Sequence, residues 1–223
     1  MVELIVVGEG QTGETFVREV LAPALAHSGV YATPRVIQTS PGHRGGALNL
    51  DRVGRFIGRT LSERTDTYLT TLFDLYALDP SFPGVIDTRG RPPADRAADI
   101  ERGLRAHIAL TGCRIERFIP HIQPHEFESL LFSDVDRLCE IEPDWHVRHA
   151  ELAAIRGAVE NPEWINDSRE TAPSRRLQRL LKPAYRKVRH GPIGAARIGL
   201  DKIREQCPHF CQWFDRITAL TPL

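Results

Sequence analysis

The stretch ELIVV at residues 3–7, followed by GEGQTG at residues 8–13, decides the fold class. The first part is a short apolar run without helical periodicity that stops at Gly8, which is typical of a buried parallel strand. From Thr12, the expected N-cap, to about Ala26 the apolar residues then recur at helical spacing. A buried strand that leads into an amphipathic helix indicates an α/β fold.

The same alternation continues along the first 140 residues. Further strands are predicted around Val36, over 67–73 and over 115–119, and helices over 50–63, 94–110 and, after Pro124, 127–138. This order predicts an α/β fold with a parallel sheet of about four strands, covered by helices on both faces. After about residue 145 the pattern is helical and loop-like. We therefore expect one α/β domain over residues 1–140 and a mainly helical extension over residues 141–223 that packs on it.

The composition is that of an ordinary soluble globular protein. Hydrophobic residues make up 41% and charged residues 26% of the 223 positions. No apolar run approaches the roughly 18 residues of a membrane span, and the first residues lack the basic segment of a signal peptide. The four cysteines are too few and too scattered for a disulfide framework. We expect a cytoplasmic protein with reduced thiols and no membrane partner.

The charge is unevenly distributed along a chain whose net charge is zero. Residues 168–204 contain eleven basic and two acidic residues, a local net charge of +9, so the rest of the chain carries −9. Phosphate contacts need no base-specific spacing, so this segment favours nucleic-acid binding. A solvated helix face, or a surface for an acidic partner, is the alternative. The expected phosphate-binding residues are Arg175, Arg176, Arg179, Lys187 and, in the glycine-containing loop HRGG, Arg44.

Acidic residues follow three of the predicted strands. Glu9 follows the first strand, Asp74 ends the third, and Glu126 and Glu128 follow the fourth. Ligands of open α/β sheets bind outside the carboxyl ends of the strands, and converging carboxylates are what a hard cation such as Mg²⁺ or Mn²⁺ requires. The alternative is that these acids only favour helix N-termini. Because they occur at corresponding strand ends, a metal site is the preferred interpretation.

Two other motifs are weaker. The GEGQTG turn fits the bare G-x-G-x-x-G spacing, but its Glu9 would face a pyrophosphate and no acidic residue closes the strand near Val36, so a dinucleotide site is disfavoured. The segment CPHFC at residues 207–211 offers three zinc ligands but lacks a clear fourth ligand and the usual C-x₂-C spacing. Buried thiols are the preferred interpretation there.

Several segments, in this order over nearly the whole chain, resemble the DUF4276 family. They are EGQT (9–12) with ETFV (14–17), FDLY (73–76), FIP (118–120), HEFESLLF (125–132), PEWIND (162–167), APSRRL (172–177) and IGL (198–200). That family is regarded as Toprim-like, related to the metal-dependent catalytic domains of topoisomerases, bacterial primases and OLD-type nucleases. The resemblance therefore implies a Toprim-like sheet. It also implies a setting beside AAA-type ATPases, often in anti-phage defence.

The resemblance also implies roles for the acidic residues. Glu9 would be the Toprim glutamate, acting as general base or metal ligand, and Asp74 the first acid of the D-x-D metal motif. The second acid of that motif is replaced by Tyr76, so Glu126 or Glu128 would supply the missing ligand. The acidic pair that the family commonly has after Thr12 is reduced here to a glycine and one glutamate.

The HEFE segment supplies the remaining candidates. If residues 124–132 are helical, Glu126 and Glu128 point about 200° apart, and only one of them faces the metal. Glu128 is preferred because it would share a helix face with His125. His125 itself is a candidate catalytic residue, as general base, phosphate donor or a group that orients a ligand, with a hydrogen-bonded half-buried histidine as the alternative.

Together these features predict an Mg²⁺-dependent nuclease that hydrolyses phosphodiester bonds of DNA or RNA. An AAA/ABC-type ATPase subunit as partner, in an anti-phage system, is implied by the resemblance alone. The competing hypothesis is a non-catalytic Toprim-like subunit that binds nucleic acid or a partner and has a degenerate metal site.

Overall fold

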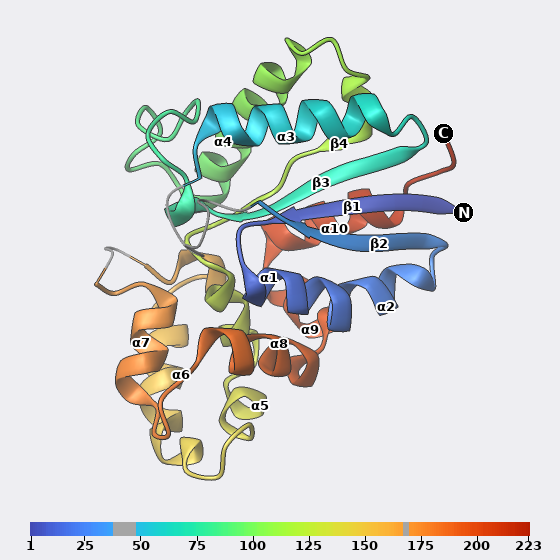
Figure 1. The fold of residues 1–223 in the computed structure, drawn as a ribbon. Coiled ribbons are helices and arrows are strands. Elements are labelled where there is room, and N and C mark those ends of the chain that lie inside the picture. Colours follow the sequence, from blue (N-terminus) through green and yellow to red (C-terminus); the bar gives the residue numbers. More distant parts are fainter. Residues whose placement is uncertain (38–47, 167–169) are drawn as a thin grey trace.

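A five-stranded parallel sheet forms the centre of the protein (Figure 1). The computed structural model describes residues 1–37, 48–166 and 170–223, so Arg44 and the HRGG loop lie outside the described residues. The strands are β1 (Val2–Gly8), β2 (Val30–Val36), β3 (Thr67–Asp74), β4 (Phe118–Ile119) and β5 (Ile122–Gln123). They are ordered β2-β1-β3-β4, with β5 also paired to β3, and all pairs are parallel. The predicted parallel α/β sheet is confirmed.

The two faces of β1 separate the hydrophobic core into two clusters. Leu4 and Val6 belong to one cluster, whereas Ile5 and Val7 belong to the other. This is the period-2 alternation of a strand that is buried on both faces, as its continuous apolar run predicts.

One continuous helical segment covers the first face. It consists of α1 (Gln11–Phe16), a π-helical stretch (Val17–Leu21) and α2 (Ala22–Ala26). The predicted N-cap is wrong: the helix begins at Gln11, with Gly10 as N-cap and no side-chain capping bond. The opposite face packs against α3 (Leu50–Glu63) and α4 (Pro93–Ala109).

The second half of the chain is mainly helical, as expected. It contains α5 (Val135–Cys139), α6 (His149–Gly157), α7 (Pro173–Leu180), α8 (Lys187–Ile198), α9 (Leu200–Gln206) and α10 (Pro208–Thr218). Ile198, Ile203 and Phe210 lie in the same hydrophobic cluster as Leu4 and Val6 of β1. The C-terminal helices therefore complete the cover of the first face, and α10 runs along the sheet in Figure 1.

Two predicted elements differ from the structure. Ile115–Arg117 is a 3₁₀ turn, and the strand after it is split into β4 and β5 around Pro120, which has no N–H to donate to a ladder. The helix predicted over 127–138 is also interrupted. Phe127–Ser133 is 3₁₀-helical, and α5 starts only after Asp134, whose side chain accepts the Arg137 N–H at 2.9 Å.

The described residues include no helix that is both long enough and apolar enough to cross a membrane. All four cysteines are free thiols.

Candidate active site

The first two predicted acids meet where β1 and β3 end. In the register of these strands Gly8 lies opposite Leu72, so Glu9 and the end of β3 fall at the same edge of the sheet. The Asp74 backbone N–H donates to Glu9 Oε1 at 2.7 Å. The Glu9 side chain thus reaches across to the neighbouring strand instead of capping the helix that follows it.

Asp74 in turn fixes the start of the HEFE segment. Its Oδ1 accepts the Phe127 N–H at 2.8 Å. His125 has a left-handed backbone with φ of 61°, and Glu126 is extended with φ of −145° and ψ of 155°. The 3₁₀ helix begins only at Phe127, so the conditional expectation of a helix through residues 124–132 is wrong.

Both glutamates of this segment therefore contact the same cation. Lys187 Nζ lies 3.2 Å from Glu126 Oε1 and 3.3 Å from Glu128 Oε2. The predicted divergence of about 200° does not occur, because Glu126 precedes the helix instead of lying within it. His125 precedes it too, so it does not share a helix face with Glu128.

Glu126 connects the acidic group to the C-terminal helices. Its Oε2 accepts the Ser174 N–H at 3.0 Å, in the first turn of α7, where N–H groups have no partner within the helix. Helix α7 begins at Pro173, with Ala172 as N-cap. Glu126 thus fixes the start of α7 and, through Lys187, the start of α8.

Glu128 is the most enclosed of the four acids, since its side chain is 1% exposed. The Tyr185 hydroxyl donates to Glu128 Oε1 at 3.4 Å, in addition to the contact with Lys187. Sequence reasoning missed this tyrosine as a partner of the site, because nothing in the local pattern relates residue 185 to residue 128.

Three of these carboxylates face one pocket of about 280 Å³. Glu126 does not line it and instead contacts the start of α7. The lining residues are Glu9, Gly10, Gln11, Thr12, Gly13, Leu72, Asp74, Phe127, Glu128, Lys187 and Val188.

Crowding of like charges makes this pocket suited to a cation. Burial raises the pKa of Glu9 to about 7, with the N–H of Asp74 and the Lys187 charge opposing the shift. Burial, and then the charges of Glu9 and Glu128, hold the pKa of Asp74 well above its usual value. The pKa of Glu128 is raised too, chiefly by burial. One ammonium does not neutralise this group, and its oxygen-only ligands are those of Mg²⁺.

The pocket oxygens are not tightly gathered. Among the described residues, the group whose ligand atoms all lie within 4.8 Å of one another is Glu101, His121 and His209, elsewhere in the fold. The pocket acids do not form such a group, and Mg²⁺, which keeps several waters, takes few protein ligands directly.

His125 lies beside the pocket without lining it. Its ring tilts against Tyr76 with a centroid distance of 5.6 Å, and Asn166 Nδ2 lies 3.4 Å from His125 Nδ1. Its backbone carbonyl accepts the Tyr76 N–H at 3.3 Å. A catalytic role for His125 stays a prediction.

The predicted phosphate-binding residues divide into two groups. Arg175 and Arg179 are exposed on α7, and Arg176 is half-buried and donates to the Thr171 carbonyl at 2.6 Å. Lys187 instead lies among the carboxylates. Because Arg175 follows the residue whose N–H binds Glu126, the exposed basic face of α7 begins beside Glu126.

A second polar cluster was not predicted at all. It joins Glu101, His121 and His209, which are distant in sequence. His209 lies within the CPHFC segment, but Cys207 Sγ contacts Ser133 Oγ at 3.4 Å and Cys211 Sγ lies 3.7 Å from Asp215 Oδ2. The thiols therefore do not gather around this histidine.

The raised pKa values predict how stability changes with pH. Between the ordinary value of 4.5 and about 7, folded Glu9 binds more protons than unfolded Glu9, so metal-free stability should fall as pH rises through this window. Mg²⁺ binds the ionised carboxylates of the folded state, so its stabilisation should be larger at about pH 8 than at about pH 5. Melting temperatures with and without MgCl₂ measure both effects.

The control for this pH experiment is Glu9→Gln, which keeps the oxygen that accepts the Asp74 N–H. Its melting temperature should depend less on pH across the same window. An unchanged pH dependence in this variant would show that Glu9 ionises normally.

Comparison with known proteins identifies the family to which this chain belongs. No curated protein and no solved structure matches this chain. A family model described as domain of unknown function DUF4276 matches residues 8–218. The match runs from the last residue of β1 to the last residue of α10, so it includes every residue of the acidic pocket. This protein belongs to the DUF4276 family.

Proposed function

We propose that the protein is an Mg²⁺- or Mn²⁺-dependent nuclease that hydrolyses phosphodiester bonds of DNA or RNA. The observation that supports this most is the pocket that Glu9, Asp74 and Glu128 line together with Lys187. Three carboxylates and one ammonium match the needs of a hydrated divalent ion and a phosphate group.

Each residue has a role that follows from its position. Glu9, Asp74 and Glu128 would hold the metal ion, which, when bound, neutralises phosphate charge and activates water. Burial raises the pKa of Glu9 to about 7, a value at which a carboxylate also works as a general base near neutral pH. Lys187 places positive charge where a phosphate would gain negative charge.

A divalent-metal nuclease assay on plasmid, single-stranded DNA and tRNA tests this proposal. We expect cleavage of at least one substrate with Mg²⁺ or Mn²⁺ and none with EDTA. Lack of cleavage of all three substrates, although Mg²⁺ raises the melting temperature, would favour the non-catalytic alternative. Lack of any metal effect would contradict the metal site itself.

The exposed basic face of α7 is proposed to position the nucleic acid. Replacing both Arg175 and Arg179 with Ala should weaken binding of duplex DNA similarly across sequences. The slope of log affinity against log salt should flatten by about 1 to 2 units, since each duplex phosphate neutralised contributes about 0.9. Fluorescence anisotropy over a series of salt concentrations measures both quantities.

The matched control is the double variant Arg55→Ala and Arg59→Ala. These arginines also lie four residues apart and exposed, but on α3, which covers the other face of the sheet. Binding and slope should stay at the wild-type values in this control. If the α7 variant binds with an unchanged slope, its arginines do not contact phosphates and the surface meets another partner.

A non-catalytic subunit is the second candidate function. Lys187 already pairs with Glu126 and Glu128, and Tyr76 stands where the second acid of a D-x-D motif would be. In this case the pocket would bind a nucleic-acid phosphate or a metal without hydrolysis. Binding of a substrate with no cleavage in any divalent metal would support it.

The partner and the cellular setting rest on the family resemblance. We propose a cytoplasmic protein that acts with an AAA/ABC-type ATPase subunit in anti-phage defence. Co-purification with an ATPase encoded beside it, and loss of phage protection on removal of either protein, would support this setting.

A further inference from the structure

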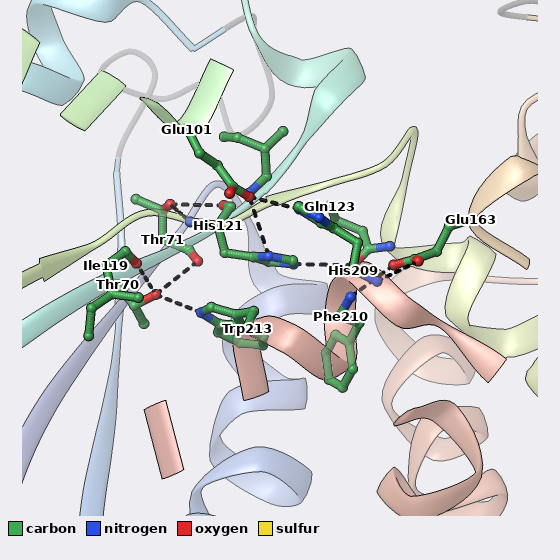
Figure 2. A network of polar contacts seen from close by, with 11 residues as sticks. Thr70, Thr71, Glu101, Ile119, His121, Gln123, Glu163, His209, Phe210 and Trp213 are labelled. Carbon is green, nitrogen blue, oxygen red and sulfur yellow. Dashed lines mark hydrogen bonds and ion pairs between the residues drawn. The ribbon is translucent and has the colours of Figure 1, made fainter. Parts of the chain in front are cut away.

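A buried group of one carboxylate and two imidazoles lies at the β4–β5 edge of the sheet (Figure 2). Glu101 comes from α4, His121 from the link between β4 and β5, and His209 from the first turn of α10. Glu101 Oε1 lies 2.8 Å from His209 Nε2 and 3.6 Å from His121 Nδ1. The side chains of His121 and His209 are 1% and 8% exposed, and that of Glu101 is 13% exposed.

The hydrogen bonds of Gln123 fix which nitrogen of His121 faces Glu101. The Gln123 amide nitrogen lies 3.3 Å from Ser129 Oγ, and the same side chain bonds the Glu163 carboxylate, which can only accept. Gln123 Oε1 is therefore the atom 3.3 Å from His121 Nε2, and this nitrogen must carry the proton. His121 Nδ1, which lies 3.6 Å from Glu101 Oε1, is therefore left without a proton.

That nitrogen is an unusual buried acceptor. His121 Nδ1 is buried and has no hydrogen-bond partner among the described residues, and the atom it faces is a carboxylate oxygen, also an acceptor. Glu101 Oε1 already accepts the Ile122 N–H at 2.8 Å, but the His121 nitrogen has no donor, and a cation bound by both atoms would satisfy it.

The surroundings hold these ligands rigidly. His121 stacks between His209 and Trp213, with centroid distances of 5.1 and 4.5 Å. Both carboxylate oxygens of Glu163 accept backbone N–H groups at the start of α10, from His209 at 2.9 Å and Phe210 at 3.0 Å. The outer nitrogen of His121 bonds the Gln123 amide oxygen, and metal-binding histidines characteristically have such a partner on the ring nitrogen that faces away from the ion.

We propose that Glu101, His121 and His209 form a binding site for a divalent ion of the Zn²⁺ type. Metal–ligand bonds of about 2.0–2.1 Å in a tetrahedron place ligands about 3.3 Å apart, close to the 2.8 and 3.6 Å seen here. Two imidazoles and one carboxylate are a zinc ligand set that leaves a fourth position for water. On binding, the ion replaces the proton shared by Glu101 and His209, which leaves to solvent.

This site is distinct from the proposed Mg²⁺ pocket in both ligands and location. It would join α4, which packs on one face of the sheet, to α10, which packs on the other, around the edge strand. A bound ion would therefore fix the C-terminal helix on the sheet. This inference does not rest on the nuclease proposal.

The test is Zn²⁺ binding by the full chain after removal of metal with a chelator. We expect about one equivalent bound, measured by competition with a chromophoric chelator, and retained in excess Mg²⁺. Co²⁺ in the same site should show the visible absorption of tetrahedral coordination. Zn²⁺ should also raise the melting temperature.

Two variants and one control identify the ligands. His121→Gln and Glu101→Gln should each weaken Zn²⁺ binding by at least about 100-fold. His149→Gln should bind as wild type, because His149 forms a similar 2.7 Å pair with Asp136 but on the surface. If His121→Gln fails to fold by circular dichroism, Glu101→Gln, which keeps a carbonyl oxygen, decides the question. Absence of a stoichiometric site in the wild type, or its survival in the folded variants, would overturn the proposal.

Discussion

Replacing Asp74 with Asn is expected to lower metal-dependent cleavage by about 1,000-fold while the fold stays intact. A carboxylate that holds a catalytic ion contributes several kcal/mol to transition-state stabilisation, and about 4 kcal/mol corresponds to this factor. Asn keeps the Oδ1 atom that accepts the Phe127 N–H, so the HEFE segment should remain in place. The initial rate of substrate cleavage at saturating Mg²⁺ is the measurement.

The same substitution should make the metal-free protein more stable. The charges of Glu9 and Glu128 contribute to holding the pKa of Asp74 well above its usual value, after burial, so the ionised side chain is unfavourable there. Asp87→Asn is the control, since Asp87 is exposed on the connection after β3. Both activity and melting temperature should match wild type in the control. Cleavage by Asp74→Asn at the wild-type rate would reduce Asp74 to a structural residue at a strand end.

Replacing Lys187 with Met is expected to lower cleavage by about 100-fold and to destabilise the metal-free protein. Removal of one well-placed charge donor near a reacting group costs about this factor in rate. It also leaves buried Glu128 without its cation, which should lower the free energy of unfolding by about 1 to 2 kcal/mol. This loss is smaller than for a fully buried ion pair, because Lys187 is 38% exposed. Kinetics and urea unfolding without metal measure the two effects.

Lys202→Met is a closely matched control for this variant. Lys202 is also 38% exposed, and its Nζ lies 3.1 Å from Glu205, but that glutamate is itself 59% exposed. Its loss should cost less than about 0.5 kcal/mol and leave activity unchanged. Lys187→Arg should retain most of the stability. If Lys187→Met is as stable and as active as Lys202→Met, Lys187 has no role in the pocket.

The alternation of strands and helices was readable from the sequence because each signal is local. The apolar run of β1 predicts a strand buried on both faces, and Leu4 and Ile5 indeed lie in different clusters. The helix predicted over 50–63 has these bounds, since its apolar residues recur at helical spacing and Asn49 accepts the Arg52 N–H. In such segments the chain needs no distant partner to choose its conformation.

The HEFE segment shows where local pattern fails. The apolar residues 127–138 have helical spacing, but Asp74 holds the Phe127 N–H and His125 adopts a left-handed backbone. Glu126 is extended as a result. Glu126 and Glu128 therefore both contact Lys187, instead of pointing apart as a helix would require. A hydrogen bond between residues 53 positions apart thus decides which acids face the site.

The sequence by itself determined that acids follow the strands of a parallel sheet, and parallel strands bring their carboxyl ends to one edge. Only the tertiary structure decided that Lys187 enters this group, and that Glu101 and His209 meet at His121 from opposite faces of the sheet. Helices α4, α8 and α10 are placed by burial of their apolar faces. The hydrophobic effect that drives this burial is non-directional and does not specify polar partners. The polar contacts follow from that packing, so no local sequence motif predicts them.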